Sequence, residues 1–259
     1  MNLTFYGLKE FPMVVPGDDL AAQIVTSAEA TGLELQDGDV IVIAQKVVSK
    51  AENRYLDLKT IVPSEEALAL AEEVDKPASK VQAILDESTE VVRKRKGVLV
   101  VQHRLGFVHA NAGIDQSNIE HEADDADSLC LLLPENPDQS AGNIRQAIHE
   151  RLGVSVAVIL NDSMGRAWRN GTLGLAIGVA GMEALESHIG ETDIFGRELL
   201  VTEVAIADEL AAGASAVMGQ TREKTPVVLI RGFEPARPVT EPDQGVRPLI
   251  RSKEMDLFR

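Results

Sequence analysis

Short runs of branched apolar residues alternate with longer amphipathic segments along this chain. The runs at 40–44, 154–160 and 225–230 predict buried strands, because each is short and bounded by turn-forming residues. Alternating residues around 91–95 predict a further strand, and 98–103 with 106–110 predict a hairpin. The predicted helices cover residues 20–31, 64–74, 77–87, 142–152 and an alanine-rich stretch that begins as a strand near 198 and ends at 218–220.

These elements bear directly on the fold class. Isolated strands, one hairpin and irregularly placed helices do not form a regular βαβ series. We therefore expect an α/β chain with a mixed-sheet α+β architecture, not a Rossmann fold. Residues 1–259 are expected to form a single unit, either undivided or built from two intertwined subdomains.

Composition excludes several classes of protein. No apolar run approaches the roughly 20 residues of a membrane span, and residues 1–6 lack the features of a signal peptide, so we expect a cytoplasmic protein without a membrane partner. The net charge of −16 disfavours nucleic-acid binding. Cys130 is the single cysteine and is expected to be a buried apolar filler. The segment 120–127 is expected to be a solvated acidic loop, and 232–248 a mobile flap.

The segment 161–171 directly follows an apolar strand and concentrates chemical groups. Asp162 offers a carboxylate that can hold a divalent cation, and Arg166 and Arg169 offer guanidinium groups that can hold phosphate oxygens. An alternative interpretation is a polar turn in which Asp162 caps a following helix and the arginines are solvated. The segment alone leaves both interpretations open.

Other candidate groups follow the strand at 40–44 and the predicted hairpin. Lys46 and Lys50 suit a small phosphorylated ligand held in an otherwise acidic protein, and Asp115 lies on a predicted loop. Asp115 and Asp162 could share a hard, oxygen-ligated metal, but spacing alone does not show that they meet. The five histidines lack zinc-ligand spacing and are expected at the surface or in packing. The standard phosphate-loop, dinucleotide, zinc-protease and nucleophile-elbow motifs are absent.

Taken together, five segments resemble the coenzyme F420-0:L-glutamate ligase family. They occur in order over almost the whole chain, at 11–20, 47–52, 111–118, 162–166 and 202–209. Residues 255–258 are also similar to the ligase portion of bacterial two-domain relatives. The resemblance implies no C-terminal nitroreductase-like domain here.

The resemblance implies a GTP-dependent ligase. Such an enzyme joins L-glutamate to the lactyl carboxylate of coenzyme F420-0 through an acyl phosphate, giving F420-1, GDP and phosphate, with further γ-glutamyl additions left open. It also implies magnesium or manganese, potassium as an additional ion, and a homodimer. The implied metal ligands are Asp115, Asp162, Ser163 and Gln220, and the implied nucleotide contacts are Phe11, Pro12, Met13, Val14, Gln45, Lys46, Lys50, Asn118, Met218 and Gly219. Lys50, Arg166 and Arg169 are the candidate catalytic residues, as clamps for phosphates or for the phosphodiester of the acceptor.

Some positions depart from the family pattern. Gln220 stands where a family member has a metal-binding glutamate, which puts a second metal in doubt. Residues 44–46 replace a Ser/Thr-rich segment, and Asn161-Asp162-Ser163 replaces Thr-Asp-Thr. Two alternatives therefore stay open: a non-catalytic paralogue that binds nucleotide or deazaflavin, and an amide ligase for another carboxylated cofactor. The joint presence of Asp115, Asp162, Ser163 and Lys50 argues against the non-catalytic paralogue.

Overall fold

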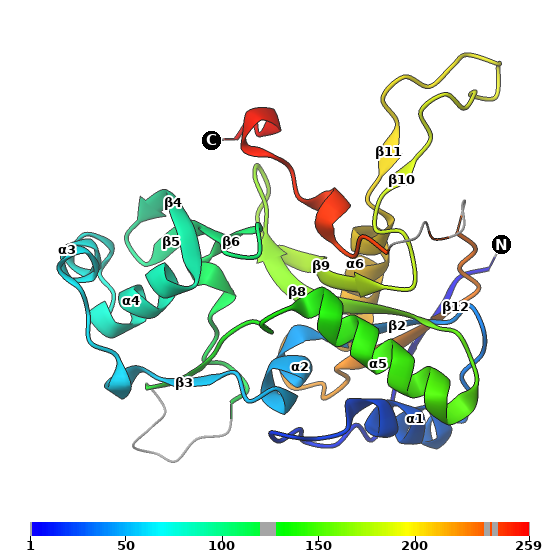
Figure 1. The fold of residues 1–259 in the computed structure, drawn as a ribbon, viewed down its shortest axis with the longest axis horizontal. Coiled ribbons are helices and arrows are strands. Elements are labelled where there is room, and N and C mark those ends of the chain that lie inside the picture. Colours follow the sequence, from blue (N-terminus) through cyan, green and yellow to red (C-terminus); the bar gives the residue numbers. More distant parts are fainter. Residues whose placement is uncertain (1, 120–127, 236–238, 240–242, 259) are drawn as a thin grey trace.

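The computed structural model describes residues 2–119, 128–235, 239 and 243–258. Its centre is a five-stranded sheet in the order β1-β12-β2-β8-β9 (Figure 1). Only the β2–β8 pair of this sheet is parallel. The predicted mixed α+β architecture is therefore confirmed. The strands are β1 (Thr4–Gly7), β12 (Val227–Arg231), β2 (Val40–Ala44), β8 (Ala157–Gly165) and β9 (Thr172–Ala180).

Helices cover both faces of this sheet. Helices α1 (Leu20–Ala30) and α5 (Pro137–Leu152) pack on one face, and α6 (Ile206–Met218) packs on the other. Along β2, Ile41 and Ile43 belong to the first core and Val42 to the second, because successive side chains of a strand point to opposite faces. A strand covered on both sides is apolar at every position, which is why the pattern predicted β2 correctly.

A smaller lobe carries a core of its own. Its antiparallel sheet, β4-β5-β6, packs against helices α3 and α4 around buried residues such as Leu70, Ile84 and Val101. The predicted hairpin is confirmed, with Val101 opposite His109. The bounds of these elements are β4 (Ser88–Arg95), β5 (Val98–His103), β6 (Val108–Ala110), α3 (Glu65–Val74) and α4 (Ala78–Asp86).

Shorter elements connect the two lobes and form a projecting arm. Helix α2 (Gln45–Ala51) follows β2 directly, and β3 (Tyr55–Asp57) pairs with β7 (Leu129–Leu131). The pair β10 (Glu186–Ser187) and β11 (Glu203–Val204) forms the base of an arm, residues 186–204, that extends away from the body (Figure 1). Four 3-10 turns complete the described structure: Leu58–Thr60, Asn111–Gly113, Arg247–Leu249 and Lys253–Met255.

Several boundaries differ from the sequence predictions. The strand predicted at 154–160 begins at Ala157 and continues to Gly165, so Asp162 lies within β8 and caps no helix. Its partner β9 and the edge strand β1 were not predicted. Helix α5 begins at Pro137, five positions before the predicted start at 142, because Asn136 caps it and proline suits the first turn.

Other sequence predictions concern single residues and loops. Cys130 is buried in the core of the smaller lobe, and burial raises the pKa of its thiol to about 11, which fits a filler and not a nucleophile. The acidic stretch 120–127 lies outside the described residues, as does part of the expected flap at 232–248. The backbone N–H of Val246, in the described part of that flap, donates to Asp138 of α5 at 3.0 Å.

Among the described residues, no helix combines the length and the apolar character needed to cross a membrane.

Candidate functional site

A cavity of about 730 Å³ lies at the carboxyl end of β2, where this strand stops beside Asn161 of its parallel neighbour β8. Ala44 and Asn161 pair at this edge, and both line the cavity. Ligands of open α/β sheets commonly bind at such an edge, where strand ends expose polar groups beyond the packed core. The cavity therefore occupies the position where this fold favours ligand binding.

The cavity gathers residues from distant parts of the chain. All residues assigned by resemblance to nucleotide or metal binding lie on its wall: Phe11, Pro12, Met13, Val14, Gln45, Lys46, Lys50, Asn118, Met218 and Gly219, with Asp115, Asp162, Ser163 and Gln220. Arg166 and Arg169 do not line it. The structure thus brings together Lys50 and the candidate ligands, and it leaves the two arginines outside.

Strand β8 presents two neighbouring side chains to different partners. A carboxylate oxygen of Asp162 lies 2.9 Å from Nε2 of His109 on β6. The next residue, Ser163, donates its hydroxyl to Oε1 of Gln220 at 2.8 Å, in the loop after α6. This divergence follows from the pleat of a strand, in which successive side chains point to opposite faces. One strand therefore ties the smaller lobe and the α6 loop to the same cavity.

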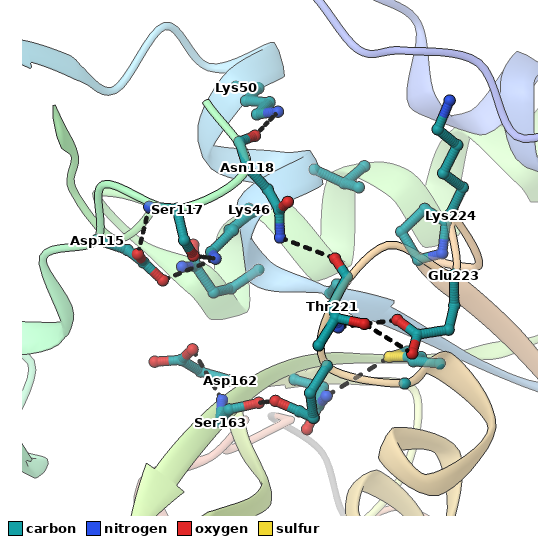
Figure 2. Close-up of a pocket in the computed structure, with 18 of the residues that line it drawn as sticks. Lys46, Lys50, Asp115, Ser117, Asn118, Asp162, Ser163, Thr221, Glu223 and Lys224 are labelled. Atoms are coloured by element: carbon teal, nitrogen blue, oxygen red, sulfur yellow. Dashed lines mark hydrogen bonds and ion pairs between the residues drawn. The ribbon is translucent and has the colours of Figure 1, made fainter. Parts of the chain in front are cut away.

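Asp115 enters the cavity from the loop that follows β6. Its carboxylate forms an ion pair with Nζ of Lys46 at 2.7 Å and accepts from the backbone N–H of Ser117 at 2.7 Å (Figure 2). Burial acts to raise the pKa of Asp115, but these hydrogen bonds and the charge of Lys46 outweigh it, and the pKa falls below its ordinary value. Asp115 is therefore held as a carboxylate inside the cavity.

Asn118 connects three walls of the cavity. Its backbone carbonyl accepts from Nζ of the buried Lys50 at 2.7 Å, and its side-chain amide donates to the carbonyl of Thr221 at 3.2 Å (Figure 2). Asn118 has a left-handed backbone with φ of 56°, a conformation that asparagine tolerates better than most residues. The residue type therefore suits the turn that brings α2 and the α6 loop together.

The loop from Thr221 to Lys224 also lines the cavity, and the sequence interpretation missed it. Glu223 accepts from the backbone N–H of Thr221 at 2.8 Å and from its hydroxyl at 3.0 Å. The available signal was the charged run at 222–224, which begins three residues after Gly219, itself a predicted contact. The cavity wall carries four cationic residues, Lys46, Lys50, Arg222 and Lys224, and three carboxylates, Asp115, Asp162 and Glu223. In a chain of net charge −16 this is a local reversal of charge that favours an anionic ligand.

His109 is the second residue that the sequence interpretation missed as a member of the site. It was expected at the surface or in packing, but its side chain, 9% exposed, lies beside Asp162. Burial acts to lower the pKa of His109, but the hydrogen bond and charge of Asp162 outweigh it, and the net shift is upward. Only its place directly before the 111–118 loop could have indicated this role.

Arg166 and Arg169 lie on the tip of the β8–β9 hairpin, residues 166–171. Nη1 of Arg166 donates to the carbonyl of Gly171 at 2.7 Å and closes the tip upon itself. Arg169 is exposed. Neither arginine is therefore placed to contact a ligand that remains inside the cavity.

The wall contains oxygen donors suited to a hard divalent cation. Asp115 and Asp162 supply carboxylates, and Ser163 and Gln220 supply neutral oxygens. Lys46 forms an ion pair with Asp115, and a ring nitrogen of His109 lies within hydrogen-bond distance of Asp162, so each carboxylate already has a nitrogen partner. No three His, Cys, Asp or Glu side chains are gathered as a metal group within the described ranges. The donor set fits magnesium or manganese, since both favour few protein ligands together with phosphate oxygens.

Comparison with known proteins identifies a family whose model covers every segment that lines this cavity. The model of a family described as F420-0:Gamma-glutamyl ligase matches residues 9–232. A coenzyme F420:L-glutamate ligase from Methanothermobacter thermautotrophicus is 45% identical over 259 residues, covering 100% of both chains. The corresponding protein of Methanocaldococcus jannaschii is 44% identical over 96% of this chain and 94% of its own length. One from Methanococcus maripaludis is 48% identical over 87% and 86%, respectively. With its family model spanning the cavity and its relatives matching nearly end to end, this chain belongs to the F420-0:gamma-glutamyl ligase family.

Proposed function

We propose that the chain is a GTP-dependent ligase that joins L-glutamate to the lactyl carboxylate of coenzyme F420-0. The products are F420-1, GDP and phosphate. The observation that carries this proposal is the convergence of segments at 11–14, 45–50, 115–118, 161–163 and 218–220 on one cavity. The names of the relatives support the choice of glutamate and F420-0 as substrates.

The cavity suits a nucleotide in size and in charge. Its volume of about 730 Å³ lies within the range of small-molecule and cofactor sites. Lys46 and Lys50 offer ammonium groups for the phosphates, while Phe11, Pro12 and Met13 supply apolar surface for a base. Lys50 is buried and its ammonium group is oriented by Asn118, so it is positioned before any ligand arrives.

A divalent cation, magnesium or manganese, belongs to this proposal, with potassium as an additional ion. Asp115 and Asp162 would hold it, assisted by Ser163 and Gln220. Such an ion neutralises charge that develops on a transferring phosphoryl group. Oε1 of Gln220 accepts from the hydroxyl of Ser163. An amide at this position therefore still offers an oxygen ligand to a metal, but it carries one negative charge less than a carboxylate.

The chemistry explains the residue types in the cavity. A carboxylate is a poor electrophile, so the acceptor is first phosphorylated by the nucleotide, and the glutamate amine then displaces phosphate from the acyl phosphate. Lys46 and Lys50 would stabilise negative charge on the phosphoryl oxygens and hold the reactants in line. Because the attacking groups belong to the substrates, no side-chain nucleophile is required, which agrees with the absence of the nucleophile-elbow motif.

A homodimer also belongs to this proposal. The arm at 186–204 exposes large apolar side chains that the described fold does not cover, among them Ile194, Phe195, Leu200 and Val201. An apolar surface on a projecting arm is suited to burial against a second copy of the chain.

Phosphate release tests the enzymatic proposal. Purified protein is incubated with GTP, manganese, L-glutamate and coenzyme F420-0, each component is omitted in turn, and the product mass is measured. Release that requires every component, with a mass gain of one glutamyl unit, is the expected result. Nucleotide binding without turnover would instead favour the non-catalytic paralogue, and turnover with a different carboxylated acceptor would favour the alternative ligase.

A further inference from the structure

The hairpin tip at 166–171 carries an aromatic residue that the cavity does not use. Trp168 is 86% exposed, although it is one of the largest apolar side chains in the protein. Its backbone is left-handed, with φ of 63°, which is a genuine outlier for a bulky residue. Such conformations gather at sites that bind ligands, where the surrounding structure holds them in place.

The tip is held in place by contacts on two sides. Arg166 donates to the carbonyl of Gly171 across the tip, and the ring of Phe258 meets Trp168 edge-on with 6.0 Å between ring centroids. The C-terminal segment that carries Phe258 is itself fixed to the smaller lobe, where Lys253 pairs with Glu90. Phe258 covers little of Trp168, so the indole is positioned but still accessible.

The tip also lies in line with the candidate site. Asp162 and Gly165 are three residues apart on β8, which corresponds to about 10 Å of strand. Arg169 is exposed on the same tip and has no hydrogen-bond partner among the described residues. Moving outward from the cavity, the chain thus runs from the carboxylate of Asp162 along β8 to a tip that carries the exposed neighbours Trp168 and Arg169.

We infer that the tip is the subsite for the distal part of the acceptor, with Trp168 stacking on its planar deazaflavin ring and Arg169 facing its phosphodiester. The inference rests on the proposed function, in which the acceptor carboxylate is phosphorylated beside the metal that Asp115 and Asp162 would hold. An acceptor that carries its carboxylate at one end and its ring and phosphodiester toward the other could reach from Asp162 to the tip, where Trp168 and Arg169 are neighbours. Stacking of a flat ring on an indole and pairing of guanidinium with phosphate are both favourable. Trp168 is then a specificity-determining residue, and Arg166 positions the tip.

Tryptophan fluorescence tests the subsite directly, because Trp168 is the single tryptophan of the chain. Coenzyme F420-0 titrated into the complete protein is expected to quench this emission in a saturable manner. GTP and L-glutamate alone are expected to leave it unchanged. Saturable quenching without turnover would uphold the subsite and overturn the proposed function. Turnover without any quenching would uphold the function and overturn the subsite.

Substitutions separate stacking from a merely structural role. Trp168→Ala is expected to raise KM for F420-0 about 10-fold or more, as loss of a stacking platform does, with KM for GTP and glutamate unchanged. Trp168→Phe is expected to restore most of the affinity, and Arg169→Ala to raise the same KM severalfold. An unchanged acceptor KM in Trp168→Ala overturns the inference, as does an equal rise for all three substrates. Dissociation of a dimer by Trp168→Ala without an effect on the acceptor also overturns it and assigns the tip to contact between copies.

Discussion

Nε2 of His109 lies 2.9 Å from a carboxylate oxygen of Asp162, although the two residues belong to different lobes. Asp162 is on the central sheet, and His109 is on the sheet of the smaller lobe. This contact joins the lobes at the cavity and keeps the Asp162 carboxylate directed to one place. A side chain of the proposed metal site is thus oriented by His109, a residue that no sequence motif marks as part of the site.

Asp162→Asn tests the role of this carboxylate. The amide keeps the size of the side chain but removes the charge that a divalent cation requires. We expect GTP-dependent turnover to fall at least about 100-fold, since loss of one charge-stabilising contact commonly costs that much. Steady-state phosphate release measures the effect, and thermal denaturation serves as the control for folding. A folded variant with normal turnover would show that the metal assignment is wrong.

The ion pair of Asp39 and Arg231 is predicted to contribute strongly to stability. Asp39 is 2% exposed, and Nε and Nη2 of Arg231 donate to its two oxygens at 2.8 and 2.7 Å. Arg231→Ala leaves a buried carboxylate without this partner, so we expect a loss of about 3 kcal/mol in the free energy of unfolding. Lys94→Ala, which breaks the exposed pair with Glu73, is the matched control and should cost less than about 1 kcal/mol. Urea denaturation compares the two, and equal losses would contradict the prediction.

Elements buried on both faces were the easiest to predict from sequence. Strands β2 and β12 are apolar throughout, and their patterns indicate them directly. Strand β9 was missed because Gly174 and Gly178 interrupt its apolar run. A Cβ atom at Gly174 would lie 2.6 Å from the carbonyl oxygen of Ala211 on α6, and one at Gly178 would lie 2.5 Å from the carbonyl oxygen of Pro137 on α5. Close helix packing, which is a tertiary effect, therefore overrides local strand propensity there.

The sequence predicted most of the residue types in the candidate site, but it did not predict which of these residues meet in space. The resemblance indicated Asp115 and Asp162, but only the fold brings these two residues, far apart in the sequence, onto one cavity wall. His109 has no spacing signal, because its role depends on β6 approaching β8. Arg169 has the chemistry expected of a phosphate clamp, but the hairpin carries it away from the cavity. Long-range packing decides each of these outcomes.

The stability of the protein is predicted to depend on pH through Asp138. Burial raises the pKa of this carboxyl above its ordinary 3.8, the nearby charge of Asp243 adds to the effect, and the N–H groups of Val179 and Val246 oppose it. The folded state therefore holds the proton more tightly than the unfolded state. Stability falls as pH rises from 3.8 through the folded pKa, and the full penalty applies above it.

Two substitutions at Asp138 separate its charge from its hydrogen bonds. Both backbone N–H groups donate to the same oxygen, Oδ1, so the amide oxygen of Asp138→Asn can accept them without the buried charge. We expect this variant to be at least as stable as the wild type at pH 7, with an advantage that shrinks toward pH 4. Asp138→Ala leaves both donors unsatisfied and should cost about 2 kcal/mol near pH 4, with a smaller loss at pH 7, where the wild type carries the buried charge. Denaturation at several pH values measures these effects, and an advantage of the Asn variant that grows in acid would contradict the assignment.

Gly174 and Gly142 are predicted to respond oppositely to alanine. At Gly174 the added Cβ would meet the carbonyl of Ala211 and, at 2.7 Å, the side chain of Ser215, so β9 and α6 must separate. We expect a loss of about 2 kcal/mol in stability. Gly142 lies inside α5 with open space around it, and alanine there should add about 0.5–1 kcal/mol through helix propensity. Thermal denaturation of both variants measures the effects, and two shifts of the same sign would contradict the packing argument.

The arm is predicted to control the association state. Ile194 and Phe195 at its end are 92% and 88% exposed, so a carboxylate there costs the isolated chain little but is unfavourable in an apolar interface. Phe195→Asp is therefore expected to convert a dimer into a monomer without lowering the thermal stability of the central sheet. Val62→Asp, at a position 87% exposed and away from the arm, is the matched control and should leave the mass unchanged. Light scattering after gel filtration gives the mass of each, and a dimer that persists in Phe195→Asp would place the interface on another surface.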